Sequence, residues 1–296
     1  MMVILGCGNF GGIGSAPELY GQGESEEEAF AIMDAAWAAG IRWFDTADAY
    51  GGGRSERAIG AWTAATGNRP RLTTKTYNPM EAGADRGLSR ERILRQIESS
   101  LVRLETDRVE LYLAHEFDPE TSVADTLAAF EELREAGTIG GYGVSNFSAG
   151  QLEDALRAGR PQVVQNSFSL LERSDEEDVL PLCAEHGLAY QAFSPLAGGW
   201  LTGKYHRGEP YPAGSRMTLR PEPYLHLGVE PVYEGLDRMS EKGDPATLAL
   251  AWVLGRPGVA AAVVGPRRPD HLEPALAARE LDLSAAERDE IASFFS

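Results

Sequence analysis

The residue types in this sequence that can take part in proton transfer recur just past the ends of short strand-like runs. Residues 41–45 form one such run, which ends at Asp45, and Tyr50 follows in a loop that closes with consecutive glycines. The next run ends at Lys75, and the one after it ends at His115. In parallel α/β proteins, catalytic and binding groups lie at the rim formed by the carboxyl ends of the strands. The spacing therefore predicts a functional site, although a buried acid that caps a helix and a tyrosine that packs on the rim give the same local pattern.

Other polar or unusual residues follow the later strand-like runs in the same way. Taken singly, each has a simpler explanation: a lone histidine is most often a satisfied core or surface residue, and a lysine at a strand end is usually solvated. Asn146 could merely cap the helix that follows it. Their recurrence at one rim is what favours a function. The residues concerned are Ser145, Asn146, Gln165, Asn166, Ser167, Phe193, Ser194, Pro195 and Gly265.

Composition narrows the class of protein. The chain has 296 residues, of which 43% are apolar, and one α/β barrel typically needs about 250 residues. No apolar run approaches the roughly 20 residues of a membrane span, and the start lacks the pattern of a signal peptide. With Cys7 and Cys183 as the only cysteines, the sequence predicts no disulfide framework and favours a reducing cytoplasm. A net charge of −18 argues against nucleic acid or an anionic membrane as a partner, so a phosphate-bearing ligand would need a local cluster of donors.

Strand and helix signals alternate along the whole chain. Strands are predicted near residues 3–5 and over 41–45, 71–75, 109–113, 140–144, 162–165, 188–193 and 259–264. Capping residues begin several of the intervening helices, most clearly Ser25, Ser89, Ser148 and Asp244. About eight such units with right-handed crossovers predict a single-domain α/β fold, a closed (β/α)8 TIM barrel over residues 1–296. Residues 197–243 lack a periodic pattern and are expected to form a long insertion on the active rim after strand seven.

Several of these stretches resemble the aldo-keto reductase family. The resemblance rests on FDTADAYG at 44–51, TK at 74–75, DRVELYLAH at 107–115, GVSNF at 143–147, VQNSFS at 164–169 and FSPLAGGWLTGKY at 193–205. It implies a (β/α)8 barrel that binds NADPH extended across its carboxyl-end face, without a separate dinucleotide-binding domain. In agreement with this, the glycines of residues 6–11 do not make a G-x-G-x-x-G fingerprint within a βαβ unit.

The resemblance implies that Asp45, Tyr50, Lys75 and His115 form a catalytic tetrad for carbonyl reduction. Hydride transfer to a carbonyl carbon leaves negative charge on the oxygen, and Tyr50 would supply the proton. A phenol has an ordinary pKa of about 10, and the Lys75 ammonium is expected to lower the pKa of Tyr50. Asp45 would hold Lys75 charged and oriented, and His115 would hydrogen-bond the carbonyl oxygen. No metal ion is needed, and the residue spacings predict no metal site.

By the same resemblance, NADP(H) is the expected cofactor, in preference to NAD(H). Ser145, Asn146 and Gln165 match positions that hydrogen-bond the nicotinamide carboxamide, and Phe193 matches the ring that stacks on it, although a core aromatic gives the same pattern. Residues 194–204 match the loop around the pyrophosphate, and residues 265–268 match the end that grips a 2′-phosphate, unless these arginines are exposed loop charges. The expected cofactor-binding residues are Gly8, Asn9, Asp45, Ser145, Asn146, Gln165, Phe193, Ser194, Pro195, Leu196, Gly198, Lys204, Gly265, Arg267 and His271.

The sequence departs from the family pattern at the adenine end and at the start of the chain. A glutamine and then Glu-Asn usually follow the two arginines, whereas His271, Pro274 and Ala275 stand at these positions. The adenine contacts are therefore unassigned, and Pro274 predicts that the helix here starts late. Many relatives also carry an N-terminal hairpin that plugs the barrel bottom. Here the C-terminal helix or a neighbouring subunit is expected to cover that end.

Three functions remain open from the sequence. The first is an NADPH-dependent reductase of aldehydes or ketones that oxidises alcohols in reverse. The second is a regulatory subunit that senses NADP(H) with little turnover, because family members resembling potassium-channel β subunits keep the same tetrad. The third, a sugar-binding or structural barrel, has no reason to keep all four tetrad residues. Neither the physiological carbonyl substrate nor the oligomeric state is fixed by these patterns. Substrate choice is expected to depend on the rim loops and on the long insertion. Its aromatic candidates are Trp200, Tyr205, Tyr211 and Tyr224, and because an aromatic in a loop is more often a packing anchor, none of them is assigned to the substrate.

Overall fold

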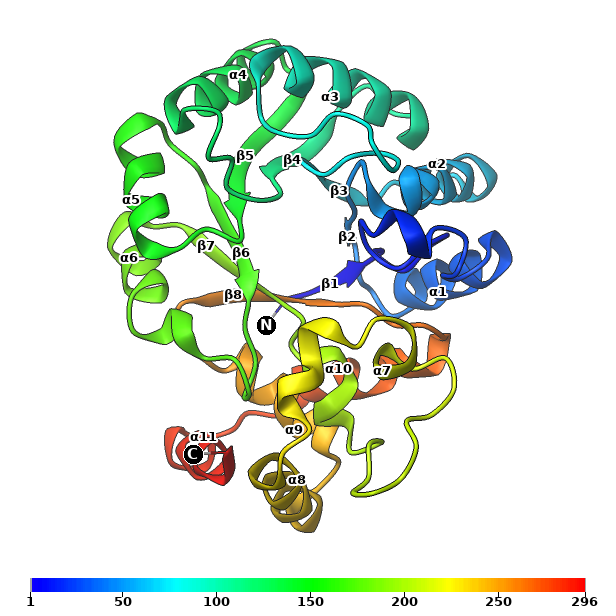
Figure 1. Ribbon diagram of the computed structural model, residues 1–296, viewed down its shortest axis with the longest axis vertical. Coiled ribbons are helices and arrows are strands. Elements are labelled where there is room, and N and C mark those ends of the chain that lie inside the picture. Colours follow the sequence, from blue (N-terminus) through cyan, green and yellow to red (C-terminus); the bar gives the residue numbers. More distant parts are fainter. Residues whose placement is uncertain (1, 296) are drawn as a thin grey trace.

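Eight parallel strands form a closed barrel in the computed structural model, which describes residues 2–295 (Figure 1). Each strand pairs in parallel with the next along the chain, and the last pairs with the first. The predicted single-domain (β/α)8 fold is therefore confirmed. The strands are β1 (Met2–Gly6), β2 (Trp43–Asp45), β3 (Arg71–Thr76), β4 (Val109–Ala114), β5 (Ile139–Ser145), β6 (Val163–Ser167), β7 (Ala189–Phe193) and β8 (Val259–Val264).

Helices surround the ring of strands (Figure 1). The predicted capping residues begin α1, α3, α5 and α9, and full capping boxes form at Ser25 and Ser148. The helices of the outer layer are α1 (Glu26–Ala38), α2 (Arg54–Thr66), α3 (Arg90–Leu104), α4 (Val123–Glu135), α5 (Ala149–Ala158), α6 (Val179–His186), α9 (Pro245–Leu254) and α10 (Glu273–Glu280). Two more, α7 (Arg216–Leu219) and α8 (Glu230–Lys242), lie in the insertion, and α11 (Ala285–Ala292) follows α10. None of the helices within residues 2–295 is long and apolar enough to cross a membrane.

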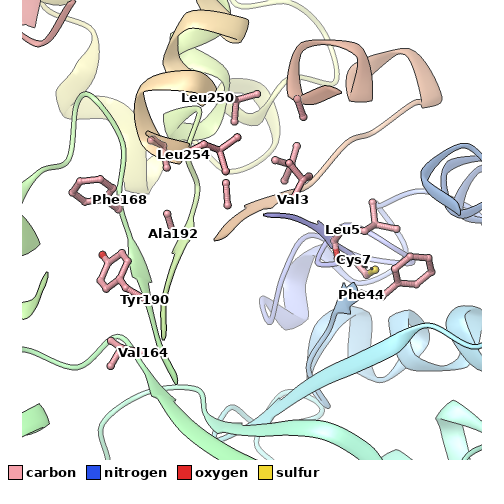
Figure 2. Packing of buried hydrophobic residues seen from close by; sticks show 14 of the residues in the cluster. Val3, Leu5, Cys7, Phe44, Val164, Phe168, Tyr190, Ala192, Leu250 and Leu254 are labelled. Carbon is pink, nitrogen blue, oxygen red and sulfur yellow. Dashed lines mark hydrogen bonds between the residues drawn. The ribbon is translucent and has the colours of Figure 1, made fainter. Parts of the chain in front are cut away.

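Strand alternation separates two kinds of buried surface. Residues such as Leu5, Phe44 and Tyr190 face the helices and join the large core between barrel and helical layer (Figure 2). Residues of the opposite phase face the barrel interior, where one cluster contains Ile4, Ala261 and Val263. Because side chains alternate along a strand, the polar residues that share the interior phase at the carboxyl ends meet on one face.

The structure differs from the sequence prediction at the start of β2 and within the insertion. The predicted strand at 41–45 is shorter, because the Ile41 N–H donates to the Ala36 carbonyl (2.9 Å) and so closes the end of α1. The expectation of an unpatterned loop over 197–243 is wrong for its last part, which is helix α8. This helix buries Val232, Leu236 and Met239 at helical spacing.

The helix after β8 does not start late. A 3-10 turn over Pro269–Leu272 leads straight into α10 at Glu273. Pro274 lies in the first turn of α10, where no intrahelical partner is needed for a backbone N–H, so it does not delay the helix.

A tryptophan and an arginine lie at the bottom of the barrel, where β2 and β3 begin. Trp43 and Arg71 are paired in register at the beginnings of β2 and β3, and the guanidinium of Arg71 lies 5.6 Å from the centroid of the Trp43 ring. The Trp43 ring packs against both interior clusters, and its indole N–H donates to the Thr73 hydroxyl (2.7 Å). Of the two covers expected for this end, the C-terminal helix is not one: α11 lies beside α8 and α9, outside the ring of strands (Figure 1), and its Arg288 carbonyl accepts from the Trp252 indole. Cover by a neighbouring subunit stays a prediction.

Candidate active site

Four side chains from the first half of the chain converge at the carboxyl-end rim. Asp45 is the last residue of β2, Lys75 lies near the end of β3, and His115 directly follows β4. Tyr50 begins a short 3-10 turn after β2, whose Gly51 has a φ of +58°. A Cβ on Gly51 would approach the Phe10 carbonyl oxygen to 2.8 Å, so this turn needs glycine to fold back against the loop after β1.

The hydroxyl of Tyr50 lies between two potential hydrogen-bond donors. The Lys75 ammonium is 3.4 Å from the Tyr50 oxygen, and the Nε2 atom of His115 is 3.3 Å from it. Lys75 also forms an ion pair with Asp45 and donates to the Thr46 carbonyl (3.0 Å). Lys75 and Asp45 are 1% and 3% exposed, so this ion pair is shielded from water. The structure thus brings together all four residues that the sequence analysis placed in the tetrad.

Burial controls the protonation of these groups. It raises the pKa of Tyr50 by more than Lys75 lowers it, so the expected net fall in the pKa of Tyr50 is wrong. Burial also favours the neutral form of Lys75, but Asp45 and Tyr50 outweigh it and raise the pKa of Lys75 above its usual value. Burial and then Lys75 hold the pKa of His115 well below its usual range. At neutral pH the site therefore holds a protonated phenol, an ammonium paired with a carboxylate, and a neutral imidazole.

Amide and hydroxyl groups from the next two strands lie beside this cluster. The Nε2 group of Gln165 donates to the second carboxylate oxygen of Asp45 (2.8 Å) and to the Gln191 side chain (3.0 Å). Asn146 has a φ of +58°, and its Nδ2 group donates to the His115 carbonyl (2.9 Å) and lies 3.3 Å from the Ser145 hydroxyl. Ser145, Asn146 and Gln165 therefore lie at the same rim as the tetrad residues, and their role at a cofactor stays a prediction.

The segment after β7 folds as a series of left-handed turns. Ser194, Gly198 and Gly199 have φ values of +51°, +64° and +94°. A Cβ on Gly199 would lie 2.6 Å from the Lys204 ammonium, so the chain approaches this cation closely. The Ser194 hydroxyl lies 3.2 Å from that of Tyr224. Phe193 packs on the interior cluster, Pro195 is buried and Leu196 packs on the main core.

Cationic side chains gather where this segment crosses the rim. Partial burial, and then the neighbouring Arg267, Arg216 and Arg268, lower the pKa of Lys204. Arg267 forms an ion pair with the buried Glu24 and donates to the Gly214 carbonyl. Arg268 instead pairs with Asp270 on the surface (3.0 Å). Of the two predicted phosphate-binding arginines, Arg267 is thus the one held at the rim.

The remaining predicted residues lie around the same rim. A Cβ on Gly8 would be 3.4 Å from the Tyr50 ring, and one on Gly265 would be 3.8 Å from the Asn9 side chain. The Oδ1 atom of Asn9 accepts from the Arg216 guanidinium (2.9 Å). The Nδ1 atom of His271 accepts from the backbone N–H of Arg267 (3.3 Å), so the His271 ring lies against the backbone of the loop that carries Arg267.

The aromatic candidates of the insertion are packing anchors. Trp200 is 0% and Tyr205 2% exposed, and their rings pack edge to face with centroids 5.0 Å apart. Tyr211 packs edge to face on both rings. The Tyr224 ring lies 2.7 Å from where a Cβ on Gly198 would be, so it covers the glycine turn.

Sequence reasoning missed polar residues that contact the predicted ones. Asn78 contacts the His115 ring, Gln191 accepts from Gln165, and Arg216 reaches Asn9. Glu116 accepts from Asn146 (3.2 Å), and burial raises the pKa of Glu116 to about 7. Gln191 could have been found, because it shares the interior phase of β7 with Phe193 and is a polar residue in a buried strand. Asn78 gave no comparable signal, since Asn-Pro in a loop reads only as a turn.

Within residues 2–295, no group of three or more His, Cys, Asp or Glu side chains is placed to hold a metal ion. What the site can do is proton chemistry at the Tyr50 oxygen, with a buried cation beside it to stabilise the anion that remains.

Comparison with known proteins places this chain among oxidoreductases. The model of the Aldo/keto reductase family matches residues 3–295. The uncharacterized oxidoreductase YrpG of Bacillus subtilis (strain 168) is 37% identical over 284 residues, which span 89% of this chain and 86% of the relative. A probable voltage-gated potassium channel subunit beta of Oryza sativa subsp. japonica is 32% identical, with 83% of this chain and 80% of that protein covered. The structure of glycerol dehydrogenase AKR11B4 from Gluconobacter oxydans matches with a TM-score of 0.84 at 26% identity, covering 99% of this chain and 90% of the other. The chain therefore belongs to the aldo/keto reductase family of oxidoreductase enzymes.

Proposed function

We propose that this protein is an NADP(H)-dependent reductase that converts aldehydes or ketones to alcohols, with Tyr50 as the general acid. The observation that carries the proposal is the position of the Tyr50 hydroxyl, 3.4 Å from the Lys75 ammonium and 3.3 Å from Nε2 of His115. A phenol between a buried cation and a neutral imidazole is suited to give a proton to an oxygen that gains negative charge.

The tetrad residues divide the work between proton donation and charge stabilisation. The raised pKa of Tyr50 keeps its phenol protonated at neutral pH, so the proton to be donated is present before the reaction begins. As the proton leaves, the Lys75 ammonium stabilises the phenolate that forms. The Asp45 carboxylate keeps Lys75 charged and in place, and Gln165 in turn fixes the other oxygen of Asp45. The Nε2 atom of the neutral His115 ring lies 3.3 Å from the Tyr50 oxygen, so a hydrogen on Nε2 would be shared between that oxygen and the oxygen of a bound carbonyl.

The residues at the rim fit a phosphorylated dinucleotide. When bound, a nicotinamide dinucleotide supplies the hydride that carbonyl reduction requires. Ser145, Asn146 and Gln165 would hold its carboxamide beside the tetrad. Lys204, Arg216 and Arg267 lie close together in a protein of net charge −18. Within residues 2–295, Glu24 is the acid described in an ion pair with this group, through Arg267, so a net positive charge remains at this part of the rim and suits an anion.

The preference for NADP(H) over NAD(H) rests on Arg267. A guanidinium can bind a phosphate through two parallel hydrogen bonds, and Glu24 and Gly214 hold this guanidinium at the rim. The Glu24 carboxylate competes with a 2′-phosphate for the Arg267 guanidinium, so the selectivity for NADP(H) over NAD(H) is expected to be moderate. The site of action proposed for this chemistry is the cytoplasm.

A redox-sensing regulatory subunit with little turnover is the second candidate. It is favoured by the similarity to the protein named as a probable potassium channel β subunit. Both candidates bind NADP(H), so cofactor affinity alone does not separate them.

The test is to mix the purified protein with NADPH or NADH and a panel of aldehydes and ketones while following nicotinamide absorbance. If the protein is a reductase, each active site is expected to reduce many molecules of at least one aldehyde or ketone in the panel. Tight cofactor binding with no more than a single turnover on any member would refute the reductase and favour the sensor.

A further inference from the structure

Asn78 contacts the His115 ring at Nδ1, the ring nitrogen that does not face Tyr50. It lies just past the end of β3, and its Nδ2 group is 3.3 Å from Nδ1 of His115. An amide NH₂ group only donates hydrogen bonds, so Nδ1 must accept and cannot carry a proton in the neutral ring. A neutral imidazole that accepts at Nδ1 carries its single ring proton on Nε2, which in His115 is the atom that faces Tyr50.

The position of that ring proton decides where the proton of Tyr50 can go. With hydrogen on Nε2, both His115 and Lys75 donate to the Tyr50 oxygen, which then uses its two lone pairs as acceptors. The hydroxyl proton of Tyr50 is left for a third partner. In the other tautomer, Nε2 would be an acceptor, and the Tyr50 hydroxyl would donate its hydrogen bond to His115 and not to a carbonyl.

We infer that Asn78 is a positioning residue that holds His115 in the Nε2–H tautomer and thereby directs the proton of Tyr50 to the oxygen of a bound carbonyl. The catalytic consequence rests on the proposed function, whereas the tautomer of His115 does not.

Asn78 is itself held by a buried arginine. Arg92 of α3, which is 2% exposed, donates to the Asn78 carbonyl (2.7 Å), to the Thr76 hydroxyl (2.7 Å) and to the Gly87 carbonyl (3.1 Å). The Thr76 hydroxyl donates in turn to the carboxyl of Asp48 (2.7 Å). This network pins the start of the loop after β3, so the amide of Asn78 faces the ring from a fixed backbone.

Several titratable groups surround the His115 ring. Lys75 comes from β3, Tyr50 from the turn after β2, and Glu116 is the next residue in the chain, while Asp45 is reached through Lys75. The nearby Lys75 ammonium opposes a second proton on the ring. Neutral His115 therefore has a choice only between its two tautomers, and Asn78 is the group that contacts Nδ1.

The first test reads the tautomer directly by ¹H–¹⁵N NMR of the histidine side chains, with His115 assigned by its loss in His115→Gln. We expect the wild-type ring to carry its proton on Nε2. In Asn78→Asp a carboxylate faces Nδ1 and accepts from it, so the proton is expected to move to Nδ1 or the ring to become doubly protonated. A wild-type ring protonated on Nδ1 would overturn the inference.

The second test is the pH profile of carbonyl reduction by the same variant. Between pH 6 and 9 the wild type is expected to show no titration of His115. Asn78→Asp is expected to lose about 10²-fold in kcat at pH 9, the scale of losing a donor to a developing oxyanion, and to recover as the pH falls and the imidazolium restores a proton on Nε2. Asn78→Ala frees the tautomer and is expected to lose about fivefold, equivalent to one hydrogen bond of about 1 kcal/mol.

Asn68→Asp, in the loop after α2, is the control for the added charge and is expected to keep the wild-type pH profile. Asn78→Asp with a wild-type profile and an Nε2–H ring would overturn the inference. A wild type with the Nε2–H ring but no turnover would support the tautomer and refute the proposed function instead.

Discussion

The ion pair between Asp45 and Lys75 is expected to be stabilising only while both partners are present. Both side chains are almost completely buried, and each oxygen of Asp45 accepts a hydrogen bond, one from Lys75 and one from Gln165. In Asp45→Asn, the amide has one oxygen and one NH₂ group, so one of the two donors must face another donor. In Lys75→Met, the Asp45 carboxylate stays buried with Gln165 as its remaining described side-chain partner.

Either single substitution is expected to lower the free energy of unfolding by about 3–5 kcal/mol, the usual cost of an uncompensated buried charge. The double variant Asp45→Asn/Lys75→Met carries no buried charge at this position, and the amide oxygen can still accept from Gln165. Its loss is expected to be about 1 kcal/mol, close to that of one hydrogen bond. The coupling energy between the two substitutions is therefore expected to be at least about 5 kcal/mol.

Urea unfolding of the four proteins, followed by far-UV circular dichroism without cofactor, measures this coupling. With a slope of about 3 kcal/mol per molar, each single variant shifts the midpoint by about 1 M or more, and the double variant returns most of the way to the wild type. If the losses of the two single variants simply add in the double variant, Asp45 and Lys75 do not interact as a buried ion pair and the reasoning is refuted.

The remaining predictions concern a buried acid and the cofactor rim. Burial, and then Glu56, raise the pKa of Asp48 from 3.8 to about 7, so Asp48 contributes stability that is complete below pH 4 and is lost as the pH rises through 7. Between pH 5 and pH 8 the wild type is therefore expected to lose about 3 kcal/mol more of its free energy of unfolding than Asp48→Asn, as measured by urea unfolding. An equal pH dependence of the unfolding free energy in the two proteins would contradict this. Lys204→Met is expected to raise the Kd for NADPH and NADH by similar factors of about tenfold, because the pyrophosphate is common to both. Arg267→Leu is expected to raise the Kd for NADPH about tenfold more than that for NADH in fluorescence titrations. Equal effects of Arg267→Leu on the two cofactors would refute its role at the 2′-phosphate.

Local sequence signals predicted most of the barrel. The strand over 259–264 and the helix starts at Ser25 and Ser148 were predicted correctly, because an apolar run and a capping hydroxyl act on neighbouring residues. Helix α8 was missed although its buried residues keep helical spacing, because Pro231 and the glycines around the helix pointed to a loop.

The strand pattern of the sequence predicted part of the site. The positions of the strand ends are enough to place Asp45, Lys75 and His115 at one rim, because parallel strands end on the same face. The direction of the pKa shift of Tyr50 was not predictable, because it depends on how deeply the folded chain buries the phenol.

Contacts between distant loops also lie beyond sequence patterns. Asn78 meets His115 across 37 residues and Arg267 meets Glu24 across 243, and neither pair leaves a periodic trace. Only the closed barrel sets these loops side by side.

The most direct test of the central claim is the rate of carbonyl reduction by Tyr50→Phe with NADPH, measured on protein whose cofactor affinity is determined in the same sample. The substitution removes only the hydroxyl that lies beside Lys75 and His115. We predict an unchanged Kd for NADPH and a fall in kcat of about 10²–10⁴-fold, the usual contribution of a positioned general acid. A variant that binds NADPH normally and reduces the carbonyl at the wild-type rate would show that Tyr50 does not supply the proton.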